Sequence, residues 1–162
     1  MVDPSQGQAK DFQAYMNMEH GIWIKYPPTW QVVEDAGAAA FMVYFLSPME
    51  SPTDKFRENL NVVVESLPGP ATLEQVVAAA RQVLAQQLRV TYLEQDVPDQ
   101  VSGLPAYRST YTGTLMERFL KWQQFSIVKG NRSYTLTYTA EPAKFDAFLG
   151  TIHQMVATLE IS

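Results

Sequence analysis

Two histidines are the only side chains in this sequence whose unperturbed charge changes near neutral pH, so they are the first candidates for chemistry. His20 follows Glu19 at the tip of an expected hairpin, where the two side chains could contact a surface metal. Metal sites normally assemble three or four ligands, however, and a solvated turn residue fits His20 better. His153 lies one residue past an apolar helical stripe, near a helix end where a cation suits the helix dipole. We therefore interpret His153 as a residue at the edge of that stripe.

Neighbouring carboxylates are the second candidates. Asp96 and Asp99 flank Pro98 at one strand end, and Glu34 and Asp35 lie at another; such pairs can share a cation or act as acid and base. Nothing in the pattern implies burial, so we interpret them as solvated charges. The sequence also has no G-x-S-x-G or H-E-x-x-H pattern and no glycine-rich phosphate loop. We therefore expect no catalytic residue, no metal site, no cofactor and no enzymatic activity.

Composition narrows the class of protein further. The chain has 162 residues, of which 46% are hydrophobic and 12% aromatic, which excludes a disordered chain and suits one domain. Without cysteine there is no disulfide scaffold, no cysteine-ligated metal and no thiol catalysis. A net charge of -5 without a basic cluster argues against a nucleic-acid partner. No apolar run approaches the roughly 20 residues of a transmembrane helix.

Alternating hydrophobic residues and turn signals predict an antiparallel sheet. Gly130 and Asn131 suit a tight hairpin turn, after which aromatic or aliphatic residues alternate with serine and threonine. Pro27 and Pro28 end the second strand, because proline donates no amide hydrogen bond. Tyr26 and Trp30 bracket this turn, and we expect both rings to pack in the core with their polar atoms satisfied. The expected strands are 12–18, 21–26, 31–35, 39–47, 59–67, 90–97, 104–113, 119–128 and 133–140.

Two segments have the 3.6-residue hydrophobic period of a helix packed on one face. The first spans about 72–89 and begins with a capping-box pattern, Thr72 followed by Gln75 three residues later. The second spans about 142–159, with Pro142 in its first turn. Strands joined by hairpins together with two one-sided helices predict an α+β fold, an α/β/α sandwich with a central antiparallel sheet. Residues 12–162 are expected to form one domain, and residues 1–11 a flexible polar leader.

Several short motifs resemble the PsbP-like superfamily in their order and spacing. They are Gly21-Ile22-x-Ile24-x-Tyr26-Pro27-x-x-Trp30, Asn59-Leu60-Asn61-Val62-Val63-Val64, Thr72-Leu73-Glu74-Gln75, Gly103-Leu104-Pro105-Ala106-Tyr107, and Tyr134-x-Leu136-Thr137-Tyr138-Thr139-Ala140 followed by Phe145. The superfamily includes the extrinsic PsbP subunit of the oxygen-evolving photosystem, DcrB-type envelope lipoproteins, the Ran-release factor of nuclear import, and chaperones of bacterial secreted effectors. The resemblance implies an α/β/α sandwich that holds another protein rather than an enzyme.

Two expected loops carry hydrophobic side chains for which a solvated loop has no need. The loop over residues 47–58 contains Met49 and Phe56, and the connection over residues 114–119 contains Met116 and Phe119. Exposed hydrophobic groups on loops suit protein docking, and methionine adapts to varied surfaces. The alternative is that these side chains fold back over the sheet. We take Met49, Phe56, Met116 and Phe119 as candidate partner-binding residues.

The primary hypothesis is a non-catalytic accessory, assembly or chaperone domain that binds another protein of unknown identity. One alternative is a binding protein of the cell envelope for a small ligand or a divalent cation, with its pocket between sheet and helix. Another is a cytoplasmic chaperone for a secreted effector. The resemblance favours the envelope or the thylakoid lumen if a leader has been removed, and the cytoplasm otherwise, so the sequence leaves the compartment and the oligomeric state open.

Overall fold

The structure is a computed structural model that describes residues 11–36, 40–53, 56–87 and 89–162. These residues form two antiparallel sheets, of strand order β1-β2-β10 and β3-β4-β5-β9-β8-β7-β6, and two α-helices. The elements are β1 (Gln13–Asn17), β2 (Ile22–Tyr26), β3 (Gln31–Ala36), β4 (Phe41–Leu46), β5 (Asn59–Ser66), α1 (Leu73–Gln87), β6 (Arg89–Val101), β7 (Leu104–Leu115), β8 (Arg118–Lys129), β9 (Arg132–Ala140), η3 (Pro142–Lys144), α2 (Phe145–Thr158) and β10 (Glu160–Ile161).

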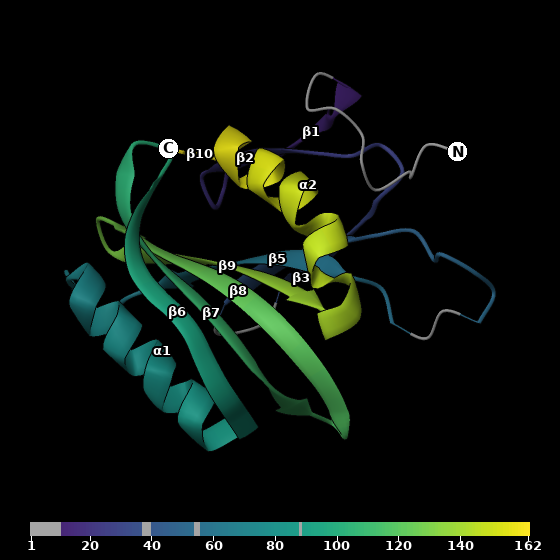
Figure 1. Cartoon of the computed structure of the whole chain (residues 1–162). Helices are drawn as coiled ribbons and strands as arrows, with labels where there is room; N and C mark the ends of the chain where they lie inside the picture. Colours follow the sequence, from purple (N-terminus) through teal and green to yellow (C-terminus); the bar gives the residue numbers. More distant parts are fainter. Residues whose placement is uncertain (1–10, 37–39, 54–55, 88) are drawn as a thin grey trace.

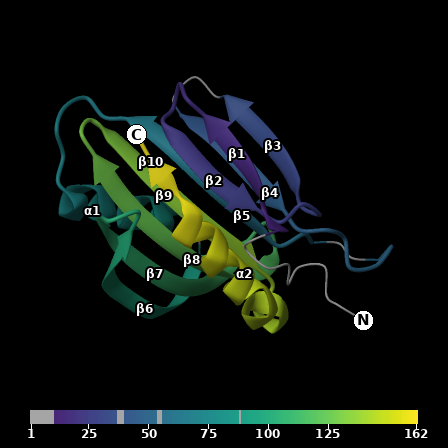
Figure 2. The same cartoon turned by 90° about the horizontal axis from the view of Figure 1, so that it is seen from above.

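The elements stack in three layers around the seven-stranded sheet (Figure 1). Helix α2 and the three-stranded sheet lie side by side over one face of the large sheet (Figure 2). Phe145 at the start of α2 stacks on Tyr138 of β9, with ring centroids 4.8 Å apart. Helix α1 covers the opposite face, where the Arg81 guanidinium lies 5.5 Å from the ring centroid of Tyr107 in β7. The predicted α+β sandwich is thus confirmed, and both predicted helices are present.

The small sheet was not predicted as a separate unit. Its strand β2 ends at Tyr26, immediately before Pro27 and Pro28, which cannot extend the ladder of hydrogen bonds. On the free side of β2, the short C-terminal strand β10 pairs Ile161 with Ile22. The proline turn therefore separates the first hairpin from the large sheet, and β10 completes a second sheet beside α2.

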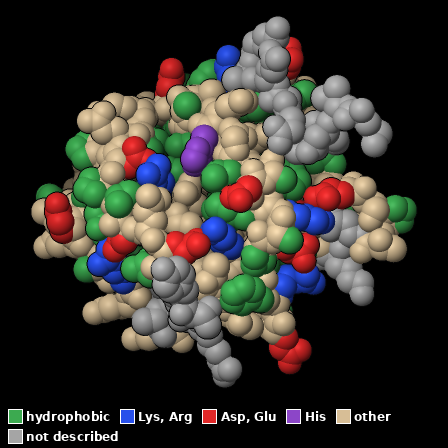
Figure 3. Space-filling view, in the orientation of Figure 1, with side chains coloured by type: hydrophobic (Ala, Val, Ile, Leu, Met, Phe, Trp, Pro, Cys, Tyr) green, Lys and Arg blue, Asp and Glu red, His purple; other side chains and the backbone are tan. Residues whose placement is uncertain are grey.

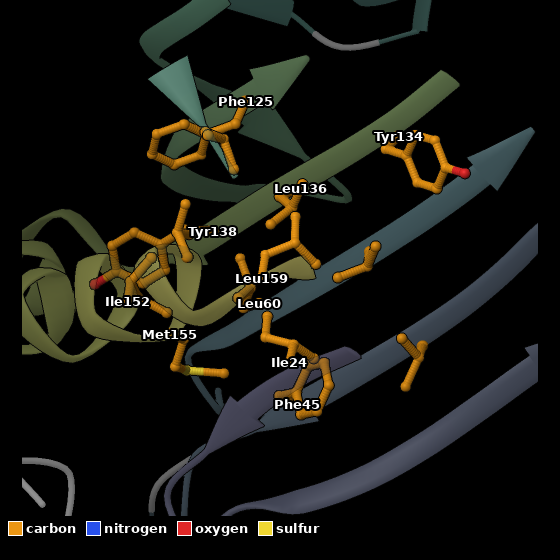
Figure 4. Packing of buried hydrophobic residues seen from close by; sticks show 14 of the residues in the cluster. Ile24, Phe45, Leu60, Phe125, Tyr134, Leu136, Tyr138, Ile152, Met155 and Leu159 are labelled. Atoms are coloured by element: carbon orange, nitrogen blue, oxygen red, sulfur yellow. The ribbon is translucent and has the colours of Figure 1, made fainter. Parts of the chain in front are cut away.

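The main core lies between the large sheet and the layer made by α2 and the small sheet (Figure 4). Cross-strand register brings Leu60 of β5 opposite Tyr138 and Val62 opposite Leu136, and all four side chains are buried. Ile152 of α2 and Ile24 of β2 close the core on the side opposite the large sheet. The strict alternation predicted for residues 133–140 therefore directs one set of side chains into this core and leaves the threonines on the other face.

Local signals in the sequence set the beginning of α1. The Thr72 amide donates to Gln75 Oε1 at 2.9 Å, and the Gln75 amide donates to Thr72 Oγ1 at 3.1 Å. This is the predicted capping box, which satisfies two amides that have no partner within the helix. In the described part of the chain, no helix has both the length and the apolar character to cross a membrane.

Gly21 lies at a close approach between the β1–β2 turn and the C-terminal strand. Its φ is +69°, and a Cβ added there would lie 3.0 Å from the carbonyl oxygen of Ser162, whose own amide donates to the Gly21 carbonyl. Gly21→Ala should therefore lower the free energy of unfolding by about 1–2 kcal/mol, measured by urea denaturation. Gly150→Ala is the matched control: this site in α2 has open space around it, so alanine should stabilise the helix by about 0.5–1 kcal/mol. Equal effects of the two substitutions would contradict the close approach.

Candidate protein-docking surface

The connection between β7 and β8 is shorter than the predicted 114–119 loop. Leu115 pairs with Arg118, so only Met116 and Glu117 form the turn. Both have positive φ, +50° and +66°, as a two-residue turn of the I′ type requires. Asn-Gly suits these positions, whereas an ordinary L-residue is disfavoured there by roughly 1–2 kcal/mol. The tip therefore has a methionine and a glutamate where the backbone conformation disfavours them.

This hairpin tip, defined as residues 115–119, exposes hydrophobic side chains. Met116 is 90% exposed and Phe119 is 51% exposed, and Leu115 is also exposed. Phe119 pairs with Thr114, so its side chain faces the side of the sheet opposite to that of Leu120, which is buried. The tip projects at the lower edge of the view in Figure 1, and Figure 3 shows hydrophobic side chains at the surface near it, bordered by charged ones.

The second predicted loop, over residues 47–58, contacts the same hairpin. Phe56 is half-buried and packs against a small cluster made by Tyr111, Leu120 and Trp122. The Arg118 guanidinium lies 5.4 Å from the centroid of the Phe56 ring. Phe56 therefore anchors the loop to β7 and β8, whereas Met49, which is 53% exposed, remains at the surface.

A chain of ion pairs also connects the loop to the hairpin. Glu50 pairs with Lys144 at 3.2 Å, Lys144 lies 3.9 Å from Glu141, and Glu141 pairs with Arg118 at 3.5 Å. These side chains are partly exposed, so each pair contributes at most about 1 kcal/mol. Their effect is mainly geometric, since these ion pairs connect the segment that contains Met49 and Glu50 with Arg118 at the base of the hairpin tip.

A buried carboxylate fixes the end of the same loop. Glu58 is fully buried, and its Oε2 accepts a hydrogen bond from the Glu141 amide at 3.1 Å. Its Oε1 has no hydrogen-bond partner among the described residues. Burial raises the pKa of Glu58 above its ordinary value of 4.5, although the hydrogen bond from Glu141 acts in the opposite direction. The folded state therefore disfavours the ionised form of Glu58.

Glu58→Gln should make stability less sensitive to pH, because glutamine keeps an acceptor for the Glu141 amide without the charge. The folded protein holds the Glu58 proton more tightly than the unfolded chain does. Glu58 therefore stabilises the wild type most at low pH, and this stability is lost as the pH rises from the ordinary pKa through the raised one. Unfolding measured from pH 4 to 8 should show the wild type losing stability relative to E58Q as the pH rises. Glu65→Gln, which removes an exposed charge, should not show this trend; a flat difference for E58Q would contradict the burial effect.

The two histidines have different surroundings. The His20 ring is half-buried rather than solvated: it stacks on Phe41 with centroids 4.1 Å apart, and its Nδ1 lies 3.0 Å from Asn17 Oδ1. His153 lies at the edge of the α2 stripe and contacts Gln123 of β8. In the described ranges, no three histidine, aspartate or glutamate side chains come together as a possible metal site.

Of the carboxylates that the sequence places at strand ends, Asp96 and Asp99 have cationic partners, whereas Glu34 accepts a hydrogen bond from the Tyr15 hydroxyl. Asp96 pairs with Arg81 of α1 and also accepts a hydrogen bond from Ser109 Oγ at 2.9 Å. Asp99 pairs with Arg108 at 3.3 Å. The interpretation of Asp96 and Asp99 as merely solvated charges is therefore incomplete, because their partners come from distant segments.

Sequence reasoning missed a second exposed hydrophobic area, on the outer face of the small sheet. Met16 pairs with Trp23 across β1 and β2, and both line a hollow of about 330 Å³ together with Met18. Met18 is 82% exposed. Ile22 and Ile24 are buried, and Trp23 lies between them on the strand, so its side chain faces away from the core. This alternation is the sequence signal that could have revealed the surface.

The comparisons with known proteins yield structural matches only. No protein-family model matches the sequence, and no curated protein matches it. Cyanobacterial PsbP (CyanoP) from Synechocystis sp. PCC 6803 superposes with a TM-score of 0.67 at 15% identity, over 97% of this chain and 95% of that one. The chain has the PsbP-like fold.

Two further structures with the PsbP-like fold match equally well by TM-score. PA94, a protein of unknown function from Pseudomonas aeruginosa, has a TM-score of 0.67 at 19% identity, over 93% of this chain and 97% of that one. LpqN, involved in cell envelope biogenesis of Mycobacterium tuberculosis, has a TM-score of 0.67 at 12% identity, over 87% and 83%. With sequence identities of 12% to 19%, the structural similarity establishes the fold alone. This is the fold that the sequence motifs indicated.

Proposed function

We propose that this chain is a non-catalytic accessory domain that binds another protein through the hairpin tip, with Met49 at the margin of the contact. The observation that carries the proposal is the turn at Met116 and Glu117. A residue that is 90% exposed contributes little to the core, and a positive φ disfavours methionine, so stability alone does not explain Met116. A binding role does explain it, because methionine fits varied partner surfaces.

The surroundings of the tip support the same proposal. Phe119 and Leu115 add exposed hydrophobic area, and the ion pairs from Glu50 to Arg118 hold the neighbouring loop in place. A hydrophobic centre with a charged rim is the usual anatomy of a protein–protein contact. The outer face of the small sheet, with Met18 and Trp23, is the competing surface, but none of its residues other than glycine has a positive φ.

In-cell photo-crosslinking tests the proposal directly. A photoreactive amino acid is placed at position 116, at position 119, at position 18 or at the exposed position Gln82 of α1. We expect the same adduct from positions 116 and 119, identified by mass spectrometry, and no such adduct from position 82. The proposal is wrong if positions 116 and 119 give no adduct, if position 82 gives the same adduct, or if the adduct forms from position 18 alone.

A further inference from the structure

An open cleft of about 420 Å³ lies between α2 and the end of the β6–β7 hairpin, on the face of the large sheet that carries α2. Its hydrophobic lining comes from Val101, Phe125 and Val156, and its polar lining includes Asp99, Arg108 and His153. The cleft shares none of these residues with the hairpin tip. Its ligand is therefore inferred independently of the docking function.

The two opposite charges in the cleft form an ion pair through a single contact. Arg108 Nη1 lies 3.3 Å from Asp99 Oδ2, and the two side chains are 28% and 30% exposed. Arg108 Nε is buried and has no hydrogen-bond partner among the described residues. A planar guanidinium can hold a carboxylate through two parallel hydrogen bonds, and a single contact with Asp99 leaves much of that capacity unused. A ligand that carries one negative and one positive group can therefore separate the pair, with its negative group on Arg108 and its positive group on Asp99.

Hydrogen bonds from the sheet determine which nitrogen of His153 carries the proton. Gln123 Nε2 donates to Thr110 Oγ1 at 3.0 Å, which directs Gln123 Oε1 toward His153 Nε2, 2.8 Å away. Oε1 can only accept, so Nε2 carries the proton and Nδ1 of the neutral ring is an acceptor. Partial desolvation of the ring and the nearby Arg108 charge lower the pKa of His153, although Asp99 acts in the opposite direction. The neutral form therefore prevails at neutral pH.

We propose that this cleft binds a free aliphatic α-amino acid. Arg108 holds the carboxylate, Asp99 and the Nδ1 acceptor of His153 receive the ammonium group, and the side chain packs against Phe125, Val101 and Val156. Each charge of a zwitterion then meets its opposite, whereas a simple anion would also face the Asp99 carboxylate and a simple amine would face the Arg108 guanidinium. The ligand replaces the Arg108–Asp99 contact with two charge-assisted interactions.

Titration of the full chain with L-valine at pH 7, followed by the amide resonances of Gly103 and Val156, tests the proposal. We expect saturable shifts at the cleft. N-acetyl-L-valine, which lacks the ammonium, and L-valinamide, which lacks the carboxylate, should bind at least about tenfold more weakly. Arg108→Gln and Asp99→Asn should weaken L-valine binding by a similar factor. Arg118→Gln, which breaks a different arginine–carboxylate pair, should bind L-valine as the wild type does.

Three outcomes would overturn the inference. The first is the absence of saturable shifts at the cleft with L-valine. The second is binding of both blocked analogues as tightly as L-valine, which would show that the cleft recognises only an apolar group. The third is unchanged L-valine affinity in a folded D99N variant. Arg108 is half-buried, so R108Q could disturb folding, and R108K is measured beside it. Lysine keeps the charge but lacks the planar donors, so the R108K variant should also bind L-valine more weakly.

Discussion

The double substitution M116N/E117G should raise the free energy of unfolding by about 1–2 kcal/mol. Asparagine tolerates the left-handed conformation at position 116, and glycine adopts it at position 117 without the steric cost of a Cβ. Neither side chain contributes to the core, since Met116 is almost fully exposed and Glu117 is exposed as well. Urea denaturation of the purified wild type and variant measures the difference through the midpoint at unchanged slope.

The β6–β7 hairpin provides a matched control for this prediction. Its turn residues Ser102 and Gly103 have φ values of +56° and +73°, so glycine already occupies the second position. Ser102→Asn should therefore change stability by less than about 0.5 kcal/mol. If M116N/E117G is no more stable than the wild type, or if S102N gains as much, the β7–β8 turn is not disfavoured in the way that its φ values indicate.

Trp30→Ala should lower the free energy of unfolding by about 3–5 kcal/mol, the largest effect expected of a single substitution here. Trp30 is buried, and its ring meets Phe148 of α2 edge to face, with centroids 6.2 Å apart. Removing the indole leaves a cavity where the proline turn packs under the helix. Thermal and urea unfolding measure the loss, and a decrease below 1 kcal/mol would contradict this packing.

Trp30→Phe separates packing from polarity at the same site. Trp30 Nε1 is buried without a hydrogen-bond partner among the described residues, contrary to the expectation that its polar atom is satisfied. Phenylalanine keeps much of the ring and removes the unpaired N–H, so the loss of volume is partly offset. We expect W30F to lose less than half as much stability as W30A. Equal losses would indicate that the indole N–H has a partner.

Local rules predicted those parts of the fold that depend on neighbouring residues. Thr72 and Gln75 form the predicted capping box, and Gly130 with φ +62° forms the predicted turn between β8 and β9. Alternation identified the buried side of β9 through Leu136 and Tyr138. Helix caps, two-residue turns and strand alternation are determined within a few residues, so one sequence is sufficient to predict them.

The small sheet and the long strands could not be predicted in this way. β10 has only two residues, and Ile161 is a strand residue because it meets Ile22, which lies far away in the sequence. β6 extends to Val101 through Pro98, a residue that argues against a strand but is tolerated at a sheet edge. Partners that are distant in the sequence determine both features.

The same limit applies to the candidate docking surface and the proposed cleft. Met116 and Met49 could be named as candidates from the sequence because a solvated loop has no need of hydrophobic residues, whereas the position of Phe56 depends on its contact with the cluster that includes Trp122 of β8. Asp99, Arg108 and His153 come from three elements, and nothing in their local sequence predicts that they share a cleft. Patterns of residue type predict candidates, but only the fold shows which of them meet.

The affinity for the protein that crosslinks from position 116 tests the central claim most directly. That protein, once purified, is titrated into the wild type, M116N/E117G and S102N by calorimetry. Because a central exposed side chain carries much of the binding energy at such contacts, we predict at least tenfold weaker binding, about 1.4 kcal/mol, for M116N/E117G and unchanged binding for S102N. Equal affinity of the wild type and M116N/E117G would contradict docking through the hairpin tip.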